Sequence, residues 1–263
     1  MTTLCTNCGF AVAVLYGLVS LGYAAIFRSV DPVKRKFVRI GAMTAVTAHF
    51  LYLILLIFKL NRLPLASMFE SLTVMSFIIG LTYIFIQFTS NESGTGIFVF
   101  PVICAAQFAG ALNNTSAQSF NPVLASPFFA AHILPSISGY AAFMISMLYS
   151  LMFILMHMQI KTRKFGLIFN RLPSLKALDN LNRRAVYTGF ALLTFGLIIG
   201  IFWAVNVWES ISPGNPKLLI SYILWLIYGI LIYLRKYQGW QGNRAASLSL
   251  ICGAVLLLSL FII

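Results

Sequence analysis

The chain has 263 residues, of which 60% are hydrophobic and 9% are charged, and its formal net charge is +13. Soluble domains carry roughly 25% charged residues, so this composition excludes a water-soluble globule. In so apolar a chain we interpret the basic excess as a signal of membrane topology, and we expect no nucleic-acid partner.

Eight apolar segments have about the length of a membrane-spanning helix, which needs about 20 mostly apolar residues. Alternating strand patterns are absent, so the sequence predicts an all-α polytopic membrane bundle, organised as one integral membrane domain over residues 1–263. No basic region precedes the first segment, so we expect a retained helix and not a cleaved signal peptide. The expected spans are 8–27, 39–61, 66–89, 96–112, 127–160, 187–206, 218–235 and 246–263.

Several helix boundaries have recognisable signals. Ser67 and Glu70 have the spacing of a capping box, which places a helix start near residue 67. Ser126 followed by Pro127 predicts the start of the fifth span. Ser174 is expected to cap a separate short amphipathic helix on the membrane surface, before the sixth span.

Basic residues concentrate in the first, fifth and seventh connections between these spans. Cytoplasmic connections of membrane proteins are enriched in lysine and arginine, so the odd-numbered connections are expected inside and both termini outside. The residues concerned are Arg28, Lys34, Arg35, Lys36, Arg39, Lys161, Arg163, Lys164, Arg171, Lys176, Arg183, Arg184, Arg235, Lys236 and Arg244.

The three histidines differ in their expected depth. His49 lies near the middle of the second span, where an ionisable side chain needs a partner and is a functional candidate. The alternative is a neutral histidine bonded to a neighbouring helix. His132 is expected at the outer end of its span, and His157 at the inner surface, where a histidine is ordinary.

The outer side of the predicted bundle gathers aromatic, cationic and imidazole side chains. Stacking faces, a cationic rim and a metal-ligating imidazole suit a planar anionic ligand such as haem. Anchoring of the aromatic side chains at the membrane interface is the alternative. The residues are His132, Trp203, Trp208, Glu70, Arg62 and Lys217.

The cysteines offer a weaker signal. Cys5 and Cys8 form a C-x-x-C pattern that could be a redox pair. They fall in a predicted short terminal tail without the strand and helix of a redox fold, so an incidental or structural role is favoured. Cys104 and Cys252 lie within spans, and we expect them to act as small apolar residues.

Several ordered blocks resemble the CcsA/ResC-type membrane proteins of cytochrome c assembly. The similarity runs from about His49 to Ala246. The blocks are HFLYLILLIF with RLPLASMFESL, SPFFAAHILPSISGYAAF, LPSLKALDNLNRRAVYTGFALLTFGLIIGIFWA, and WLIYGILIYLRKYQGWQGNRAA.

The resemblance implies roles for individual residues. It makes His49 a haem-iron ligand within the membrane and His132 a haem-iron ligand on the outer face. It places Trp203 and Trp208 at the start of the family's tryptophan-rich loop. Asn215 stands where that loop has an aspartate, and Lys217 follows as part of its Pro-Lys. Arg62 and Glu70 are the remaining expected cofactor-binding residues.

The loop also departs from the family pattern. Ser212 and Gly214 replace two tryptophans, and no histidine follows the last span in the printed sequence. We therefore expect Met68, water or a partner's histidine to complete the iron ligation on the outer face. Similarly reduced loops occur in the HemX-like branch.

The resemblance implies a non-enzymatic protein of a bacterial cytoplasmic membrane. It would bind haem non-covalently, as b-type haem, and present it on the outer face for attachment to apocytochrome c. The expected partners are haem, apocytochrome c and a second membrane protein of the CcsB/ResB type. The alternative is a HemX-like membrane regulator of haem biosynthesis.

Overall fold

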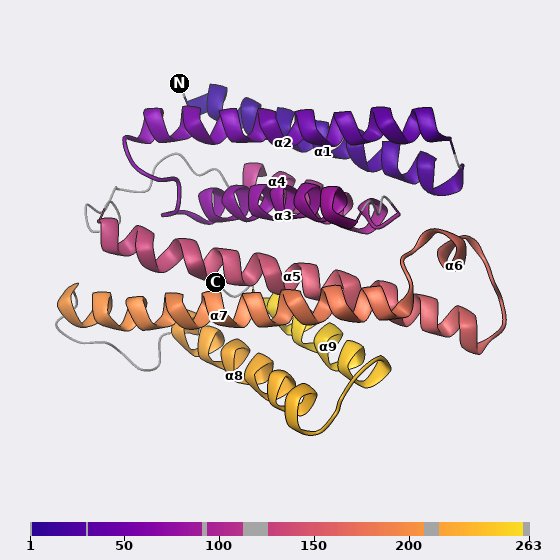
Figure 1. Ribbon diagram of the computed structural model, residues 1–263. Coiled ribbons are helices and arrows are strands. Elements are labelled where there is room, and N and C mark those ends of the chain that lie inside the picture. The colour runs from indigo at the N-terminus through magenta and orange to yellow at the C-terminus, as the bar shows by residue number, and fades with distance from the viewer. Residues whose placement is uncertain (1, 30, 91–93, 113–125, 208–215, 260–263) are drawn as a thin grey trace. The chain divides into compact units, whose positions relative to one another are not determined.

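A computed structural model describes residues 2–29, 31–90, 94–112, 126–207 and 216–259, and the described chain is helical with no strand (Figure 1). The helices are α1 (Thr2–Arg28), α2 (Pro32–Leu60), α3 (Met68–Ser90), α4 (Gly96–Leu112), α5 (Pro127–Lys161), α6 (Leu167–Arg171), α7 (Leu175–Val207), α8 (Pro216–Tyr237) and α9 (Asn243–Ser259).

Each of the eight predicted spans coincides with one helix, α6 being the additional short one. Six of these helices are long and apolar enough to cross a membrane, and α4 and α9 are shorter apolar helices. The prediction of an all-α polytopic membrane bundle is confirmed. The sidedness of the termini stays a prediction.

Contacts within the chain divide it into two compact units, Met1–Ser126 and Pro127–Ile263. The first unit contains α1 to α4 and the second contains α5 to α9. The expectation that both belong to one membrane domain stays a prediction.

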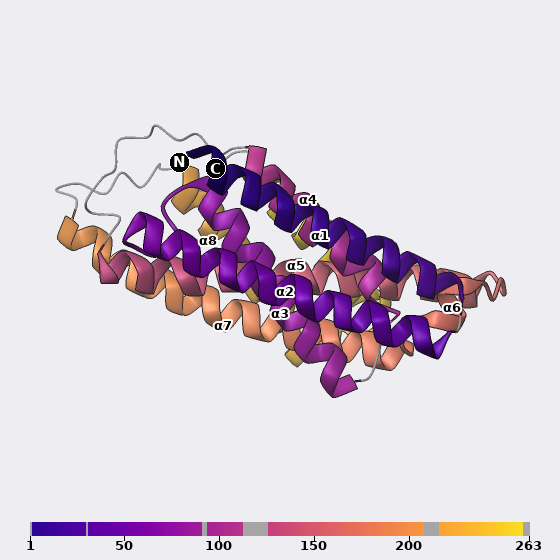
Figure 2. The same cartoon turned by 90° about the horizontal axis from the view of Figure 1, so that it is seen from above.

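The first unit is a bundle of four helices in which α1 contacts α2 and α4, and α3 contacts the same two helices (Figure 2). Its core is aromatic. Tyr23 stacks on Phe100 with 5.0 Å between ring centroids, and Tyr83 meets both rings edge-on. This filled core holds α1 against α3 and α4.

The second unit is organised around α5, which contacts α6, α7 and α9, while α8 contacts α7 and α9 (Figure 1). Helices α5 and α7 approach each other through small residues. A Cβ added at Gly139 would lie 3.0 Å from the Gly189 carbonyl oxygen and 3.0 Å from the Leu193 nitrogen. Small residues let membrane helices approach backbone to backbone, so glycine is required at this crossing.

Several predicted helix boundaries are confirmed, with two differences. Helix α5 begins at Pro127 as expected. The Ser174 hydroxyl accepts a hydrogen bond from the Ala177 N–H at 3.3 Å, as a cap would. The prediction of a separate short helix after Ser174 was wrong, because these residues form the first turns of the continuous helix α7. The predicted tail around Cys8 is likewise helical, since α1 begins at Thr2.

Helix α2 begins after Asp31, which the sequence analysis did not identify as a cap. Its carboxylate accepts hydrogen bonds from the N–H groups of Val33 and Lys34 at 2.9 and 3.3 Å. The hydrogen bond from the Lys34 backbone, together with the one from Val33 and the Lys34 charge, lowers the Asp31 pKa from its ordinary value. The cap holds the start of the helix that carries His49.

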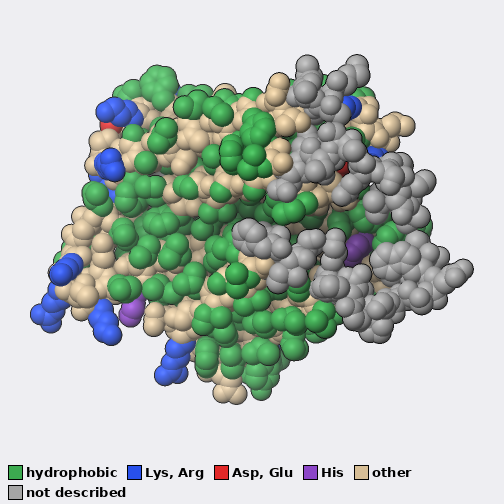
Figure 3. All heavy atoms as spheres, turned by 180° about the vertical axis from the view of Figure 1, so that it is seen from behind, with side chains coloured by type: hydrophobic (Ala, Val, Ile, Leu, Met, Phe, Trp, Pro, Cys, Tyr) green, Lys and Arg blue, Asp and Glu red, His purple; other side chains and the backbone are tan. Residues whose placement is uncertain are grey.

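The surface is apolar along the helices. Figure 3 shows hydrophobic side chains covering the middle of the helices, with lysine and arginine concentrated toward their ends. Exposed large apolar side chains occur on every long helix, as lipid contact requires.

Candidate functional site

His49 lies in the interior of the first unit, on the inward face of α2. Its side chain is fully buried. Nδ1 lies 2.9 Å from the Tyr16 hydroxyl oxygen of α1, and Phe77 of α3 meets the ring edge-on at 5.5 Å between centroids. Tyr52, one turn further along α2, packs against the imidazole at 6.2 Å between ring centroids. The imidazole is therefore held by three helices.

The second ring nitrogen of His49 is the unusual feature of this pocket. Nε2 is buried and has no hydrogen-bond partner among the residues that the structure describes. When Nδ1–H donates to the Tyr16 oxygen, Nε2 carries an unprotonated lone pair, which is the form that ligates metals. A second hydrogen bond on the far nitrogen is the usual way in which a protein orients a metal-ligating histidine.

The sequence analysis placed His49 correctly within a span but missed Tyr16. The two residues are 33 positions apart and belong to different helices. No spacing rule connects them, and α1 contains a second tyrosine, Tyr23, so the sequence does not single out Tyr16. The hydrogen bond to a neighbouring helix that the alternative interpretation requires is present at Nδ1, while Nε2 has no described partner.

Arg62 and Glu70 form a bidentate ion pair in the turn between α2 and α3. The two nitrogen–oxygen distances are 2.7 and 2.8 Å, and both side chains are largely buried. The Glu70 carboxylate also accepts from the Ala66 N–H at 2.7 Å, and the Glu70 N–H donates to the Ser67 hydroxyl at 3.2 Å. Half of the predicted capping box is present, because the Ser67 hydroxyl accepts from the Glu70 N–H. The Glu70 carboxylate, however, accepts from the N–H of Ala66 and not from that of Ser67, as a capping box would require.

This pair gives both residues a structural task that the sequence analysis did not foresee. Planar bidentate pairing between arginine and carboxylate fixes geometry as well as charge. The pair thereby closes the 61–67 turn, which links the helix that carries His49 to α3. The predicted contact of Arg62 and Glu70 with a cofactor stays a prediction.

His132 lies in the second unit, near the start of α5, and is half-buried. Its Nδ1 lies 2.7 Å from the Gly196 carbonyl oxygen of α7. A carbonyl can only accept, so Nδ1 is a protonated nitrogen, and in the neutral imidazole the lone pair is on Nε2. The ring lies against Gly200, where an added Cβ would come within 2.5 Å of two ring atoms. Glycine at this position makes room for the imidazole.

Trp203 is close to His132, as the sequence analysis expected. The two rings are nearly parallel, with 6.5 Å between centroids and 14° between planes. Phe129, one turn before His132 on α5, packs against Trp203 at 5.5 Å. Helices α5 and α7 therefore bring one imidazole and one indole together at the same end of the second unit.

Three predicted residues of the following loop are not placed. Trp208 and Asn215 lie outside the described residues, and for Lys217 only the backbone, in the first turn of α8, is described. Among the described residues, no three His, Cys, Asp or Glu side chains gather as a metal site. The candidate metal ligands are therefore two separate imidazoles, one in each unit.

The remaining reactive groups are accounted for by packing. His157 stacks on Phe153 at 6.2 Å, one turn earlier on α5. The Cys104 thiol donates to the Ala13 carbonyl at 3.3 Å, and Cys252 is buried, as expected of small apolar residues. Cys8 is a free thiol on α1.

Comparison with known proteins gives a consistent family. A family model described as cytochrome C assembly protein matches residues 37–263. The chain is 27% identical over 245 residues to the cytochrome c biogenesis protein CcsA of Heterosigma akashiwo, covering 80% of this chain and 76% of that protein. It is 30% identical over 243 residues to CcsA of Prochlorococcus marinus, covering 78% and 74%.

A solved structure shares the fold. The cytochrome c heme lyase CcmF superposes with a TM-score of 0.68 at 16% sequence identity, over 99% of this chain. The chain spans 47% of the length of that protein, so the likeness concerns the fold alone. By the extent of the family match and the CcsA relatives, this chain is a multi-pass membrane protein that belongs to the cytochrome c assembly protein family.

Proposed function

We propose that this protein binds haem non-covalently and presents it on the outer face of the membrane for attachment to apocytochrome c. The observation that carries the proposal is the buried Nε2 of His49, which has no partner among the described residues while Tyr16 holds Nδ1. A buried polar atom without a partner costs free energy, so we expect Nε2 to bind a ligand.

The donor set suits iron that arrives in a porphyrin. A porphyrin supplies its own equatorial nitrogens, so the protein needs to offer only axial ligands such as histidine. His49 offers one such ligand within the first unit. His132, with Trp203 beside it, offers a second imidazole next to an aromatic face. Bound haem would supply the vinyl groups that react with the target's cysteines.

We assign the protein a binding and positioning role and no nucleophile of its own. In this assignment the Tyr16 hydroxyl orients the His49 ring, the Gly196 carbonyl orients the His132 ring, and Trp203 stacks on the ligand. Arg62 and Glu70 shape the turn after α2, and Trp208 and Asn215, with Lys217 at the start of α8, belong to the outer segment that would receive haem. The heme lyase named in the comparison is consistent with a part in haem attachment.

The proposal implies partners. A second membrane protein of the CcsB/ResB type would contribute a further iron ligand. The membrane would be a bacterial cytoplasmic membrane, with the Trp203–Lys217 segment on its outer side.

Deleting the gene in the source organism tests the proposal. Covalently haem-stained c-type cytochromes should disappear, return with the wild-type gene, and stay absent with His132→Ala at equal protein level. His157→Ala is the matched control, because that histidine lies on the same helix and its ring stacks on Phe153, away from Trp203. Normal c-type cytochromes together with altered porphyrin levels would overturn the proposal and favour a HemX-like regulator.

A further inference from the structure

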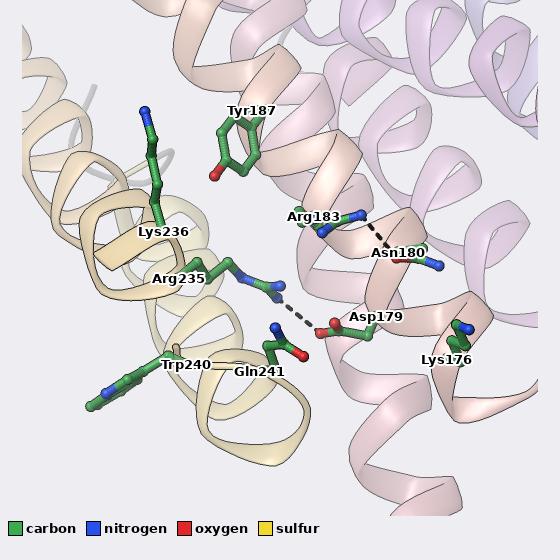
Figure 4. Close-up of a pocket in the computed structure, with 9 residues that line it drawn as sticks. All are labelled: Lys176, Asp179, Asn180, Arg183, Tyr187, Arg235, Lys236, Trp240 and Gln241. Carbon is green, nitrogen blue, oxygen red and sulfur yellow. Dashed lines mark hydrogen bonds and ion pairs between the residues drawn. The ribbon is translucent and has the colours of Figure 1, made fainter. Parts of the chain in front are cut away.

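A basic pocket lies in the second unit between α7, the end of α8 and the turn that follows it. It has a volume of about 590 Å³, and its lining (Figure 4) includes neither His132 nor Trp203. Its lining residues are Lys176, Asp179, Asn180, Arg183, Tyr187, Arg235, Lys236, Trp240 and Gln241.

The pocket carries a positive charge that the protein does not neutralise. Four of the lining residues are lysine or arginine and one is an aspartate. That aspartate, Asp179, is already paired with Arg235 at 3.2 Å. Lys176, Arg183 and Lys236 have no ion pair among the described residues, although Arg183 donates to the Asn180 side chain. An anion entering the pocket would meet several unneutralised cations.

Arg235 is the buried basic residue of the pocket, held by hydrogen bonds to its neighbours. Its side chain is 3% exposed and reaches from α8 toward Asp179 on α7 (Figure 4). One terminal nitrogen donates to both Asp179 and the Asn182 amide oxygen. Its Nε is buried and has no hydrogen-bond partner in the described part of the chain. The guanidinium is therefore fixed in place through one terminal nitrogen, while its Nε–H is left unused.

A polar network behind Arg235 keeps it oriented. The Asn182 amide nitrogen lies within 2.7 to 3.1 Å of oxygen atoms of Ser146, Ser150 and Ser249. These acceptors force the amide oxygen to face Arg235, because the nitrogen side is the donor. The ordering of the guanidinium is thus already built into the fold, and a ligand would not have to supply it.

The surroundings of the pocket are apolar, which suits a ligand with a hydrocarbon part. Helices α7 and α8 are the two least buried of the six candidate spans. They expose large apolar side chains beyond the pocket, among them Phe195, Ile198, Leu226 and Ile230. Tyr187 and Trp240 line the pocket, and such side chains favour the boundary between hydrocarbon and headgroups.

We propose that this pocket binds the phosphate of an anionic phospholipid, whose acyl chains lie along the exposed faces of α7 and α8. Basic pockets between transmembrane helices are suited to phosphate-bearing headgroups. Arg235 is the fixed donor, and Lys176, Arg183 and Lys236 supply the surrounding charge. The site does not depend on haem binding and uses none of the proposed haem ligands.

Lipid titrations of the purified full chain in detergent test this proposal. Phosphatidylglycerol should bind saturably, while phosphatidylcholine should not. Glycerol phosphate, a soluble phosphate ester that is at least as negatively charged as that headgroup and has no acyl chains, should not compete at equal concentration. Equal competition by glycerol phosphate would show a site for soluble phosphate and overturn the assignment to a lipid.

A pair of double variants makes the test specific. Lys176→Gln with Arg183→Gln should weaken phosphatidylglycerol binding about tenfold or more, since each basic residue near a membrane surface contributes appreciably. Lys164→Gln with Arg184→Gln removes the same charge from neighbouring exposed residues that do not line the pocket, and should change binding less than twofold. Equal weakening of phosphatidylglycerol binding by both double variants would mean that only the net charge of the protein matters, and would contradict binding in the pocket.

Discussion

The Tyr16 hydroxyl lies 2.9 Å from Nδ1 of His49, between two helices of the first unit, and leaves Nε2 of the imidazole buried without a described partner. This relationship divides the two ring nitrogens into a structural one and an available one. The imidazole is thus oriented toward a ligand at Nε2 by a residue that need not touch that ligand.

Tyr16→Phe should weaken haemin binding while leaving the fold intact. The variant keeps the ring and removes only the hydroxyl that is hydrogen-bonded to Nδ1 of His49. Loss of such an outer partner typically costs about 10- to 100-fold in metal affinity. Titration of the purified variant with haemin, followed by its absorption spectrum, measures the change.

Tyr23→Phe is the control for that experiment. Tyr23 is a fully buried tyrosine of the same helix, and its hydroxyl donates to Gln87 at 3.2 Å. Its haemin affinity should stay within about twofold of the wild type, because the hydroxyl does not contact His49. Equal losses in the two variants would mean that Tyr16 acts through general packing of the bundle.

Gly200→Ala should disturb His132 without removing it. The new Cβ would come within 2.5 Å of the imidazole, which can rotate away because it is a side chain. We expect the yield of c-type cytochromes to fall toward that of His132→Ala, at unchanged protein level. Gly41→Ala, at a helical site with nothing within 4 Å of the added Cβ, should retain full yield. Full yield in Gly200→Ala would show that the present orientation of His132 is not used.

Gly139→Ala should lower stability, because its contacts are backbone atoms of α7 that cannot move away independently. Overpacking of this kind costs on the order of 1–3 kcal/mol. Thermal unfolding in detergent measures the effect as a lower Tm. Gly17→Ala adds a Cβ at ordinary contact distance, 3.6 Å from the Cys104 sulfur, and should leave the Tm unchanged or higher. Unchanged Tm in Gly139→Ala would contradict the close crossing of α5 and α7.

Glu70→Gln should destabilise the first unit. The change leaves the largely buried Arg62 without its carboxylate, and breaking a buried pair from one side costs on the order of 3 kcal/mol. Asp31→Asn removes a carboxylate from an exposed pair with Lys34 and keeps a capping side chain, so its Tm should not change measurably. If Glu70→Gln weakens haemin binding and leaves the Tm unchanged, the pair belongs to the ligand site and not to the turn.

The helices were predictable because the membrane imposes their length and composition. Every predicted span coincides with a helix, since twenty apolar residues leave the backbone no alternative in lipid. The boundary before the sixth span was misplaced because basic side chains between Leu175 and Arg184 looked like a connection. No proline interrupts α7 from Leu175 to Val207, so the helix continues through them.

The partners of the candidate residues were not predictable. The bond from Tyr16 to His49 and the contact of His132 with the Gly196 carbonyl depend on how helices pack, which periodicity does not encode. The proximity of Trp203 to His132 was anticipated from their common position at one end of the predicted spans. The ion pair of Arg62 with Glu70 was missed because both residues had been interpreted as ligand contacts.

Haemin titration of the purified wild-type protein, His49→Ala and His157→Ala, followed by the Soret band, tests the central claim most directly. The account predicts a saturable Soret band in the wild type and His157→Ala, and a strongly weakened or altered band in His49→Ala. A wild-type protein that gains no such band, or a His49→Ala variant that binds haemin with unchanged affinity and spectrum, would contradict it.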